Sequence, residues 1–173
     1  MNPTLSAWNA ADPDVATAAL LSCCAAERWA GALVAQRPFA SEAAIIAAAD
    51  EAWSTMEEDD WMQAFRAHPR IGERKVENAT AQSKQWSADE QSAVDQALAE
   101  ILAELASGNR KYEEQFGFTY IVCATRKSAE EMLQILRRRL NSDREAELRE
   151  AAKQQRQITQ IRLRKWLQTG DQP

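Results

Sequence analysis

The chain has 173 residues, of which 45% are hydrophobic and 27% charged, an ordinary composition for a soluble globular protein. This length predicts one domain over residues 1–173, and the formal net charge of −5 gives no sign of a nucleic-acid-binding surface. Three cysteines and one histidine, without a C-x-x-C spacing, argue against a disulfide framework and against a metal site. We find no signal peptide and no membrane-spanning stretch in the sequence, so we expect a cytoplasmic protein.

Abundant alanine and few glycines or prolines predict helices in the first part of the chain. Asp12 is a typical N-cap followed by proline, and the helix it starts should continue, with a possible break, to Val34. Ser41 is a typical cap for the next helix. Its apolar positions, which repeat at helical spacing, are Ile45, Ala48, Ala49, Ala52 and Met56. An acidic break at residues 57–60 then precedes a short helix over residues 61–67.

His68 is the only histidine, and it lies where the sequence forces a helix to end. Pro69 disfavours helical backbone angles at the preceding residue, and Gly72 permits a chain reversal shortly afterwards. An unperturbed imidazole pKa of about 6.5 suits proton transfer near neutral pH. A simpler interpretation is a structural histidine whose charge complements the dipole at a helix C-terminus.

Residues 70–86 show no helical periodicity, and a polar loop of this length in a compact domain is usually functional or mobile. Ser87 and Glu90 have the spacing of a capping box, which predicts that a helix begins there. Apolar residues recur once per turn along this helix, and Ser107, Gly108 and Asn109 should end it.

Residues 116–123 are aromatic and β-branched, but the sequence contains no other run that could pair with them as a strand. We therefore predict an extended, buried segment within an all-α protein. Backbone N–H groups that no helix uses need other partners, and a bound anion is one candidate.

The last two helices should begin at a second capping box, starting at Ser128, and at residues 141–143. The predicted inward positions of the last helix are Ala151, Ile158 and Ile161. Arg162 lies one turn after Ile158 and should border the same face. The basic clusters at residues 137–139 and 162–165 are interpreted as solvated helix faces.

Four motifs in this order and spacing resemble the OHCU decarboxylases, which act on 2-oxo-4-hydroxy-4-carboxy-5-ureidoimidazoline (OHCU). The motifs are residues 67–72, 87–91, 116–123 and 158–163. The resemblance covers nearly the whole chain. It implies an all-α fold and decarboxylation of OHCU, a small anionic ureide, to (S)-allantoin in urate degradation. It also implies no cofactor and a homodimer, while the composition, charge and hydropathy described above already predict no metal and no nucleic-acid or membrane partner. The chain departs from the family pattern at residues 73–86 and at Tyr120, where phenylalanine is common.

The resemblance also assigns roles to individual residues. His68 matches the family's proton-transfer histidine, Glu90 its active-site carboxylate, and Arg162 an arginine that borders the pocket. The positions that match substrate-contacting residues are Pro69, Ser87, Gln91, Tyr120, Ile121, Val122, Cys123 and Ala124. Simpler roles stay open for Glu90, as the reciprocal partner in a capping box, and for Arg162, as a charge that complements the helix dipole. We expect Cys123 to be a small buried apolar residue rather than a nucleophile.

The chemistry of this reaction fits the residue types. The substrate carboxylate is on a carbon next to a ring C=N, so the electrons left by CO2 can enter the ring without pyridoxal, thiamine or a metal. Arginine binds carboxylates through bidentate bonds, and a histidine can deliver one proton to one face of the resulting enol. Backbone N–H groups after Gly117 can hold a developing oxyanion.

Two other functions remain compatible with the sequence. A hydrolase of a cyclic ureide could use His68 and Glu90 to activate water, and the absence of CO2 among its products would distinguish it. A non-catalytic helical interaction module could dock through the basic last helix, and replacing His68 would then leave its function intact.

Overall fold

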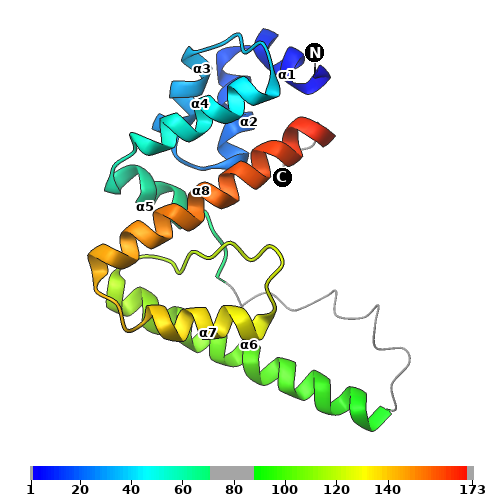
Figure 1. Cartoon of the computed structure of the whole chain (residues 1–173), viewed down its shortest axis with the longest axis vertical. Helices are drawn as coiled ribbons and strands as arrows, with labels where there is room; N and C mark the ends of the chain where they lie inside the picture. Colours follow the sequence, from blue (N-terminus) through cyan, green and yellow to red (C-terminus); the bar gives the residue numbers. More distant parts are fainter. Residues whose placement is uncertain (1, 71–87, 171–173) are drawn as a thin grey trace. The chain divides into compact units, whose positions relative to one another are not determined.

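The computed structural model describes residues 2–70 and 88–170, and in residues 88–95 it describes the backbone only. Within these ranges the chain forms eight α-helices and no strand, which confirms the all-α prediction (Figure 1). The chain divides into two compact units, Met1–Ala67 with Leu148–Pro173 and His68–Glu147, and each is described by itself. The single domain stays a prediction, and most of the predicted loop lies outside the described residues.

The first unit contains five helices and most of a sixth. They are α1 (Pro3–Ala10), α2 (Pro13–Cys23), α3 (Glu27–Ala35), α4 (Glu42–Ser54), α5 (Glu58–Arg66) and most of α8 (Arg144–Thr169). Asp12 caps α2 by accepting the Asp14 N–H at 2.9 Å, and the gap between α2 and α3 confirms the predicted break. Helix α1 was not predicted, although Asn2 before a proline carries the same signal; Asn2 accepts the Leu5 N–H at 3.0 Å.

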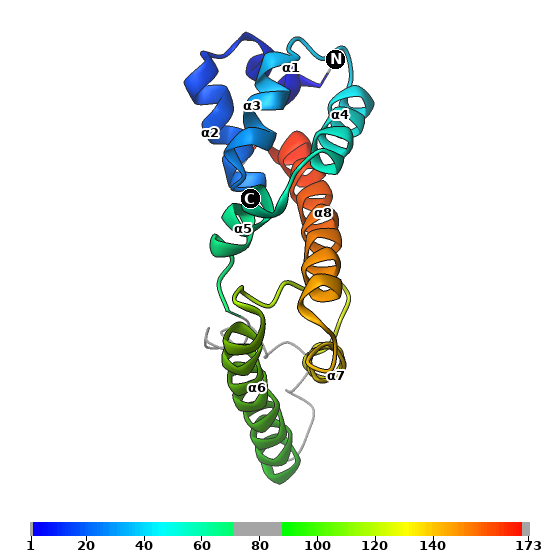
Figure 2. The same cartoon turned by 90° about the vertical axis from the view of Figure 1, so that its left-hand side faces the viewer.

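Helix α4 confirms both its predicted cap and its predicted core. Ser41 Oγ accepts the Ala44 N–H at 3.2 Å. All the predicted apolar positions from Ile45 to Met56 are buried. Helix α8 lies beside α4, as Figure 2 shows, and Trp53 Nε1 donates to the Ala152 carbonyl at 3.1 Å.

The acidic stretch at residues 57–60 is part of α5 rather than a break before it. The Asp60 carboxylate accepts the Glu57 N–H at 3.0 Å in a capping box, and acidic side chains are favourable in the first turn of a helix. Helix α5 ends at Arg66 with Ala67 as its C-cap. The prediction that a short helix ends just before His68 is therefore confirmed.

The buried face of α8 differs from the predicted one. Ile161 is 42% exposed and Ile158 is only partly buried, whereas Ala151 is buried as predicted. Gln155 and Thr159 take inward positions, and Gln155 Nε2 donates to Thr159 Oγ1 at 3.1 Å. The prediction was therefore wrong for Ile161 and only partly met by Ile158, because polar residues that hydrogen-bond each other can be buried on this face.

The second unit is built on α6 (Ala88–Phe116) and α7 (Ala129–Arg139), which pack against each other. The predicted end of α6 at Ser107, Gly108 and Asn109 is wrong, because the helix continues to Phe116. Gly108 is a close-packing residue instead: a Cβ atom on it would lie 2.6 Å from Leu136 Cδ2. The capping box at Ser128 is confirmed, with the Glu131 N–H donating to Ser128 Oγ at 3.2 Å.

We expect Gly108→Ala to lower the free energy of unfolding by about 1 kcal/mol, because overpacking outweighs the better helix propensity of alanine. Gly31 in α3 is the control, since a Cβ there would have no heavy atom within 4 Å. Gly31→Ala should therefore raise stability by about 0.5–1 kcal/mol. Denaturant unfolding measures both changes, and a stabilised Gly108→Ala protein would contradict the packing role.

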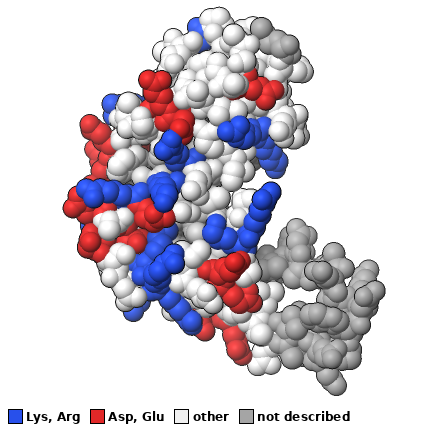
Figure 3. Space-filling view, viewed as in Figure 1, with Lys and Arg blue, Asp and Glu red and all other residues white. Residues whose placement is uncertain are grey.

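Basic and acidic side chains are intermixed on the face of the molecule in Figure 3. Arg137 and Arg138 are exposed, as predicted, but Arg139 is only 4% exposed, so the interpretation of this run as a solvated face is wrong for Arg139. Arg162 is partly buried, whereas its basic neighbours Arg164 and Lys165 are exposed. No helix within the described ranges combines the length and the hydropathy needed to span a bilayer.

Candidate functional site

His68 follows directly on the C-cap of α5 and begins the second unit. Its side chain is partly buried, whereas those of Pro69 and Arg70 are exposed. Arg70 makes a bidentate ion pair with Glu113 of α6, with Nε–Oε1 and Nη2–Oε2 distances of 2.8 and 2.7 Å. This paired geometry fixes the chain just after His68 against α6.

We expect Glu113→Gln to lower kcat a few-fold, because the loss of the ion pair loosens the backbone beside His68. The pair is partly exposed, with side-chain exposures of 46% for Arg70 and 21% for Glu113, so the stability loss should stay below about 1 kcal/mol. Glu104→Gln is the control, because Glu104 forms an exposed α6–α7 pair with Arg137. Equal kcat values for wild type and Glu113→Gln would remove this positioning role.

The Arg70–Glu113 pair should make the stability of the fold depend on pH. The hydrogen bonds from Arg70 hold the pKa of the Glu113 carboxyl below its usual range. A lowered folded-state pKa stabilises the fold above the unfolded-state pKa, and this contribution disappears as the pH falls through the folded-state value. The stability difference between wild type and Glu113→Gln should therefore shrink in acid, as unfolding curves at several pH values will measure.

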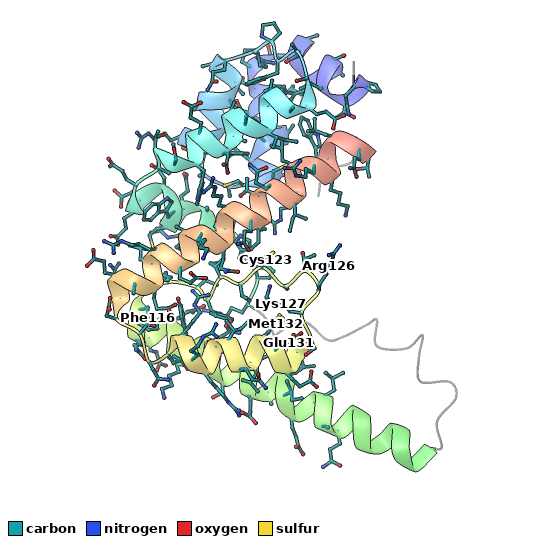
Figure 4. The ribbon with its side chains drawn as sticks, in the orientation of Figure 1. Phe116, Cys123, Arg126, Lys127, Glu131 and Met132 are labelled. Atoms are coloured by element: carbon teal, nitrogen blue, oxygen red, sulfur yellow. The ribbon has the colours of Figure 1, made fainter. Side chains whose placement is uncertain are left out.

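The predicted buried segment without helix or strand pairing is confirmed from residue 117 onward, whereas Phe116 is the last residue of α6. Gly117, with φ of +81°, turns the chain at the end of α6, a conformation that glycine adopts without steric cost. Figure 4 shows the chain running from Phe116 past Cys123 to a turn at Arg126 and Lys127 before α7. The side chains of Tyr120, Ile121, Val122 and Cys123 are all buried, and that of Ala124 is exposed. We refer to residues 118–124 as segment 118–124.

Side chains hold two carbonyls of segment 118–124. The carbonyl of Ile121 accepts a bond from Arg139 Nη1 at 2.6 Å, and that of Cys123 accepts one from Lys127 Nζ at 2.6 Å. Within the described part of the chain, the N–H groups of Tyr120, Ile121, Val122 and Ala124 donate no hydrogen bond, and the carbonyls of Tyr120 and Val122 accept none. The segment can therefore offer these N–H groups, as well as two carbonyls, to a ligand.

Arg162 belongs to the first unit, on α8. Its Nη1 donates to the carbonyl of Cys23, the last residue of α2, at 3.4 Å. Cations are favourable at this end of a helix, where carbonyl groups lack helical partners.

The cysteines have the properties of buried structural residues. Burial raises the pKa of the Cys23 thiol to about 11 and also raises that of Cys24, so neither is a ready nucleophile. Cys123 is buried as predicted. In the described ranges, no three His, Cys, Asp or Glu side chains converge as metal ligands do.

The remaining predicted site residues are placed only in part. Glu90 and Gln91 lie near the start of α6, with side chains outside the described residues, and Ser87 lies wholly outside them. His68, Pro69 and segment 118–124 belong to the second unit, whereas Arg162 belongs to the first. The roles assigned to these residues stay predictions.

Sequence reasoning missed a buried polar cluster beside segment 118–124. It consists of Arg139, Glu147 and Tyr112, all buried and joined by hydrogen bonds. One signal was available in the sequence: Arg139 lies three residues after Leu136, a spacing that places both side chains near the same face of α7.

The described ranges thus form an all-α protein in which a histidine follows a helix end and a buried segment is hydrogen-bonded to a neighbouring helix. A family model described as OHCU decarboxylase matches residues 9–164. The chain therefore belongs to the OHCU decarboxylase family, whose members are carboxy-lyases.

Individual relatives agree with this assignment. The uric acid degradation bifunctional protein TTL of Arabidopsis thaliana is 35% identical over 83% of this chain, which spans 44% of that protein's length. The 2-oxo-4-hydroxy-4-carboxy-5-ureidoimidazoline decarboxylase of Haloferax volcanii is 27% identical over 73% of each chain. A crystal structure of OHCU decarboxylase in the presence of (S)-allantoin superposes with a TM-score of 0.70 at 30% identity, covering 91% of this chain and 99% of that one.

Proposed function

We propose that the chain decarboxylates OHCU to (S)-allantoin in urate degradation, without a cofactor or a metal. The observation that carries this proposal is the backbone of segment 118–124. Its side chains from Tyr120 to Cys123 are buried, and N–H groups within it have no acceptor in the described part of the chain. N–H groups held in fixed positions can stabilise negative charge that develops on a substrate during a reaction. Family membership supports OHCU as the anionic substrate.

The reaction involves two neighbouring ring carbons. The bond between the hydroxyl-bearing carbon and the carboxylate breaks, CO2 leaves, and the bonding electrons enter the adjacent ring C=N, giving an enol. One proton then adds to one face of the ureido-bearing carbon while the enol hydroxyl loses its proton to become the carbonyl, and we assign delivery of the added proton to His68. The N–H groups of segment 118–124 stabilise the charge that builds up on the substrate between the loss of CO2 and the addition of this proton.

Five further residues complete the site in this proposal. Arg162 binds its carboxylate or ureido group, since a guanidinium can bond the Cys23 carbonyl through one nitrogen and an anion through the others. Glu90 orients either the substrate hydroxyl or the His68 imidazole. Gln91 contacts the substrate from the same turn, with Pro69 and Ser87 lining the site.

The test uses freshly generated OHCU, because this substrate also decays spontaneously. We expect the protein to accelerate CO2 release and to give optically active allantoin, since an enzyme protonates one face only. Consumption of OHCU without CO2 release would indicate hydrolysis of the ring instead. A rate and an optical activity equal to those of the protein-free reaction would overturn the proposed function.

We also propose that the protein is a homodimer, as its resemblance to the family implies, and that it is cytoplasmic, as expected from the sequence. Light scattering should then give twice the mass of one chain. A mass equal to one chain across the micromolar range would contradict the dimer.

A further inference from the structure

Segment 118–124 needs an external anchor because no helix or sheet holds its backbone. Arg139, on the last turn of α7, supplies one: its Nη1 donates to the Ile121 carbonyl at 2.6 Å. Tyr120 adds a second attachment to the same helix, through its hydroxyl and the Met132 carbonyl at 3.3 Å. The segment that offers N–H groups to the substrate is thus held by α7 at two neighbouring residues.

The Arg139 guanidinium is itself held in one orientation. Its Nε donates to Glu147 Oε2 at 2.7 Å, and its Nη2 donates to the Tyr112 hydroxyl at 3.1 Å. The Tyr112 hydroxyl in turn donates to Glu147 Oε2 at 2.7 Å. The network therefore joins the side chains of Tyr112, Arg139 and Glu147 to the Ile121 carbonyl.

Aromatic rings complete the surroundings of this charge. The Arg139 guanidinium carbon lies 5.0 Å from the centre of the Tyr120 ring and 5.6 Å from that of the Tyr112 ring, within the range of cation–π attraction. Tyr112 also packs edge-on against Tyr120, with ring centres 5.3 Å apart. The guanidinium can therefore move only if the rings beside it move as well.

Stability alone does not explain this buried ion pair, because removing both charges from water has a large desolvation cost. The side chains of Arg139 and Glu147 are 5% and 3% exposed, and hydrophobic residues of similar volume often stabilise a fold as well as a buried ion pair does. What apolar residues cannot do is bond to a backbone carbonyl and fix its direction. Lysine cannot reproduce the set of bonds either, because its ammonium is a point donor on a flexible stem.

We propose that Arg139 is a positioning residue for the decarboxylation. Held by Glu147 and Tyr112, it fixes the Ile121 carbonyl and thereby aims the N–H groups of segment 118–124 at the substrate. This inference rests on the proposed function, in which those N–H groups bind the substrate.

The test is Arg139→Lys, which keeps the charge beside Glu147 but loses the fixed bond to the Ile121 carbonyl. We expect kcat to fall and KM to rise, with kcat/KM reduced about 10-fold to 100-fold, because small displacements of binding groups have effects of that order. A smaller folded fraction would lower kcat alone and leave KM unchanged. Amide exchange in segment 118–124 should become faster, with exchange in α4 unchanged.

Arg37→Lys is the matched control. Arg37 Nη1 also donates to backbone carbonyls, those of Trp8 and Ala11, both at 2.8 Å, and its guanidinium lies 5.3 Å from the Trp8 ring. None of these residues has a place in the proposed site. Arg37→Lys should therefore lower the unfolding temperature without changing KM or exchange in segment 118–124.

Tyr112→Phe decides the question if Arg139→Lys does not fold. This change keeps the ring and removes the hydroxyl that bonds both Arg139 and Glu147, so the same rise in KM and in exchange should appear to a smaller degree. A folded Arg139→Lys protein with wild-type KM and exchange would overturn the inference, as would a wild-type-like Tyr112→Phe protein if Arg139→Lys does not fold. Failure of the wild type to decarboxylate OHCU would instead count against the proposed function, and the exchange result would still stand.

Discussion

His68→Asn should reduce kcat for OHCU decarboxylation by on the order of 10²–10⁴-fold, the contribution expected of one general acid–base group. Asparagine can still hydrogen-bond but cannot exchange a proton near neutral pH, so the change removes the proposed chemistry with little change in polarity. Initial rates with freshly generated OHCU measure the effect, after subtraction of the spontaneous decay.

Thermal unfolding of the same variant separates catalysis from structure. The chain around His68 is held by other groups, namely the end of α5 on one side and the Arg70–Glu113 ion pair on the other. The unfolding temperature of His68→Asn should therefore stay close to that of the wild type. A variant that retains activity within a few-fold but melts earlier would show that His68 is a structural residue.

Helix starts could be predicted from the sequence because the signals that produce them are local. Asp12, Ser41 and Ser128 each accept a backbone N–H within the first turn of the helix that follows, and this bond depends on nearby residues only. The same logic applies to Asn2, whose helix α1 could have been predicted from an identical N-cap and proline pattern. The break at Pro69 and the turn at Gly117 are local in the same sense.

Predictions failed where a residue's neighbours are distant in the sequence. Glycine between serine and asparagine is typical of a helix end, but Gly108 lies inside α6, where it leaves room for the Leu136 side chain of α7. Gln155 and Thr159 are polar, yet they hydrogen-bond each other and lie on the buried face of α8, whereas Ile161 is exposed. In both places tertiary packing outweighs local propensity.

The same distinction between local and distant contacts applies to the candidate site. The position of His68 just after a helix end and the extended segment follow from local rules, namely proline after His68 and an unpaired β-like run in a helical chain. The anchor of that segment does not, because Arg139 reaches the Ile121 carbonyl and Glu147 through space. The run from Arg137 to Arg139 has the sequence pattern of a solvated helix face, although Arg139 is buried and bonded to Glu147.

Glu90→Gln should cut turnover on the order of 10²–10⁴-fold while leaving the unfolding temperature nearly unchanged. A capping box accepts either glutamate or glutamine at this position, so a residue that serves only the helix start would tolerate the substitution. If the carboxylate charge orients the substrate hydroxyl or the His68 imidazole, the neutral amide cannot replace it. Initial rates and thermal unfolding on the same preparation distinguish these two roles.

Two other variants serve as controls for the Glu90→Gln measurement. Glu131→Gln changes the capping box at the start of α7, where the carboxylate accepts the Ser128 N–H at 2.7 Å, and it should alter neither stability nor rate. Ser87→Ala should cost about 1 kcal/mol of stability if Ser87 caps α6, although its proposed contact with the substrate makes its rate less diagnostic. A stable Glu90→Gln protein with wild-type turnover would remove Glu90 from the mechanism and leave His68 without its proposed carboxylate partner.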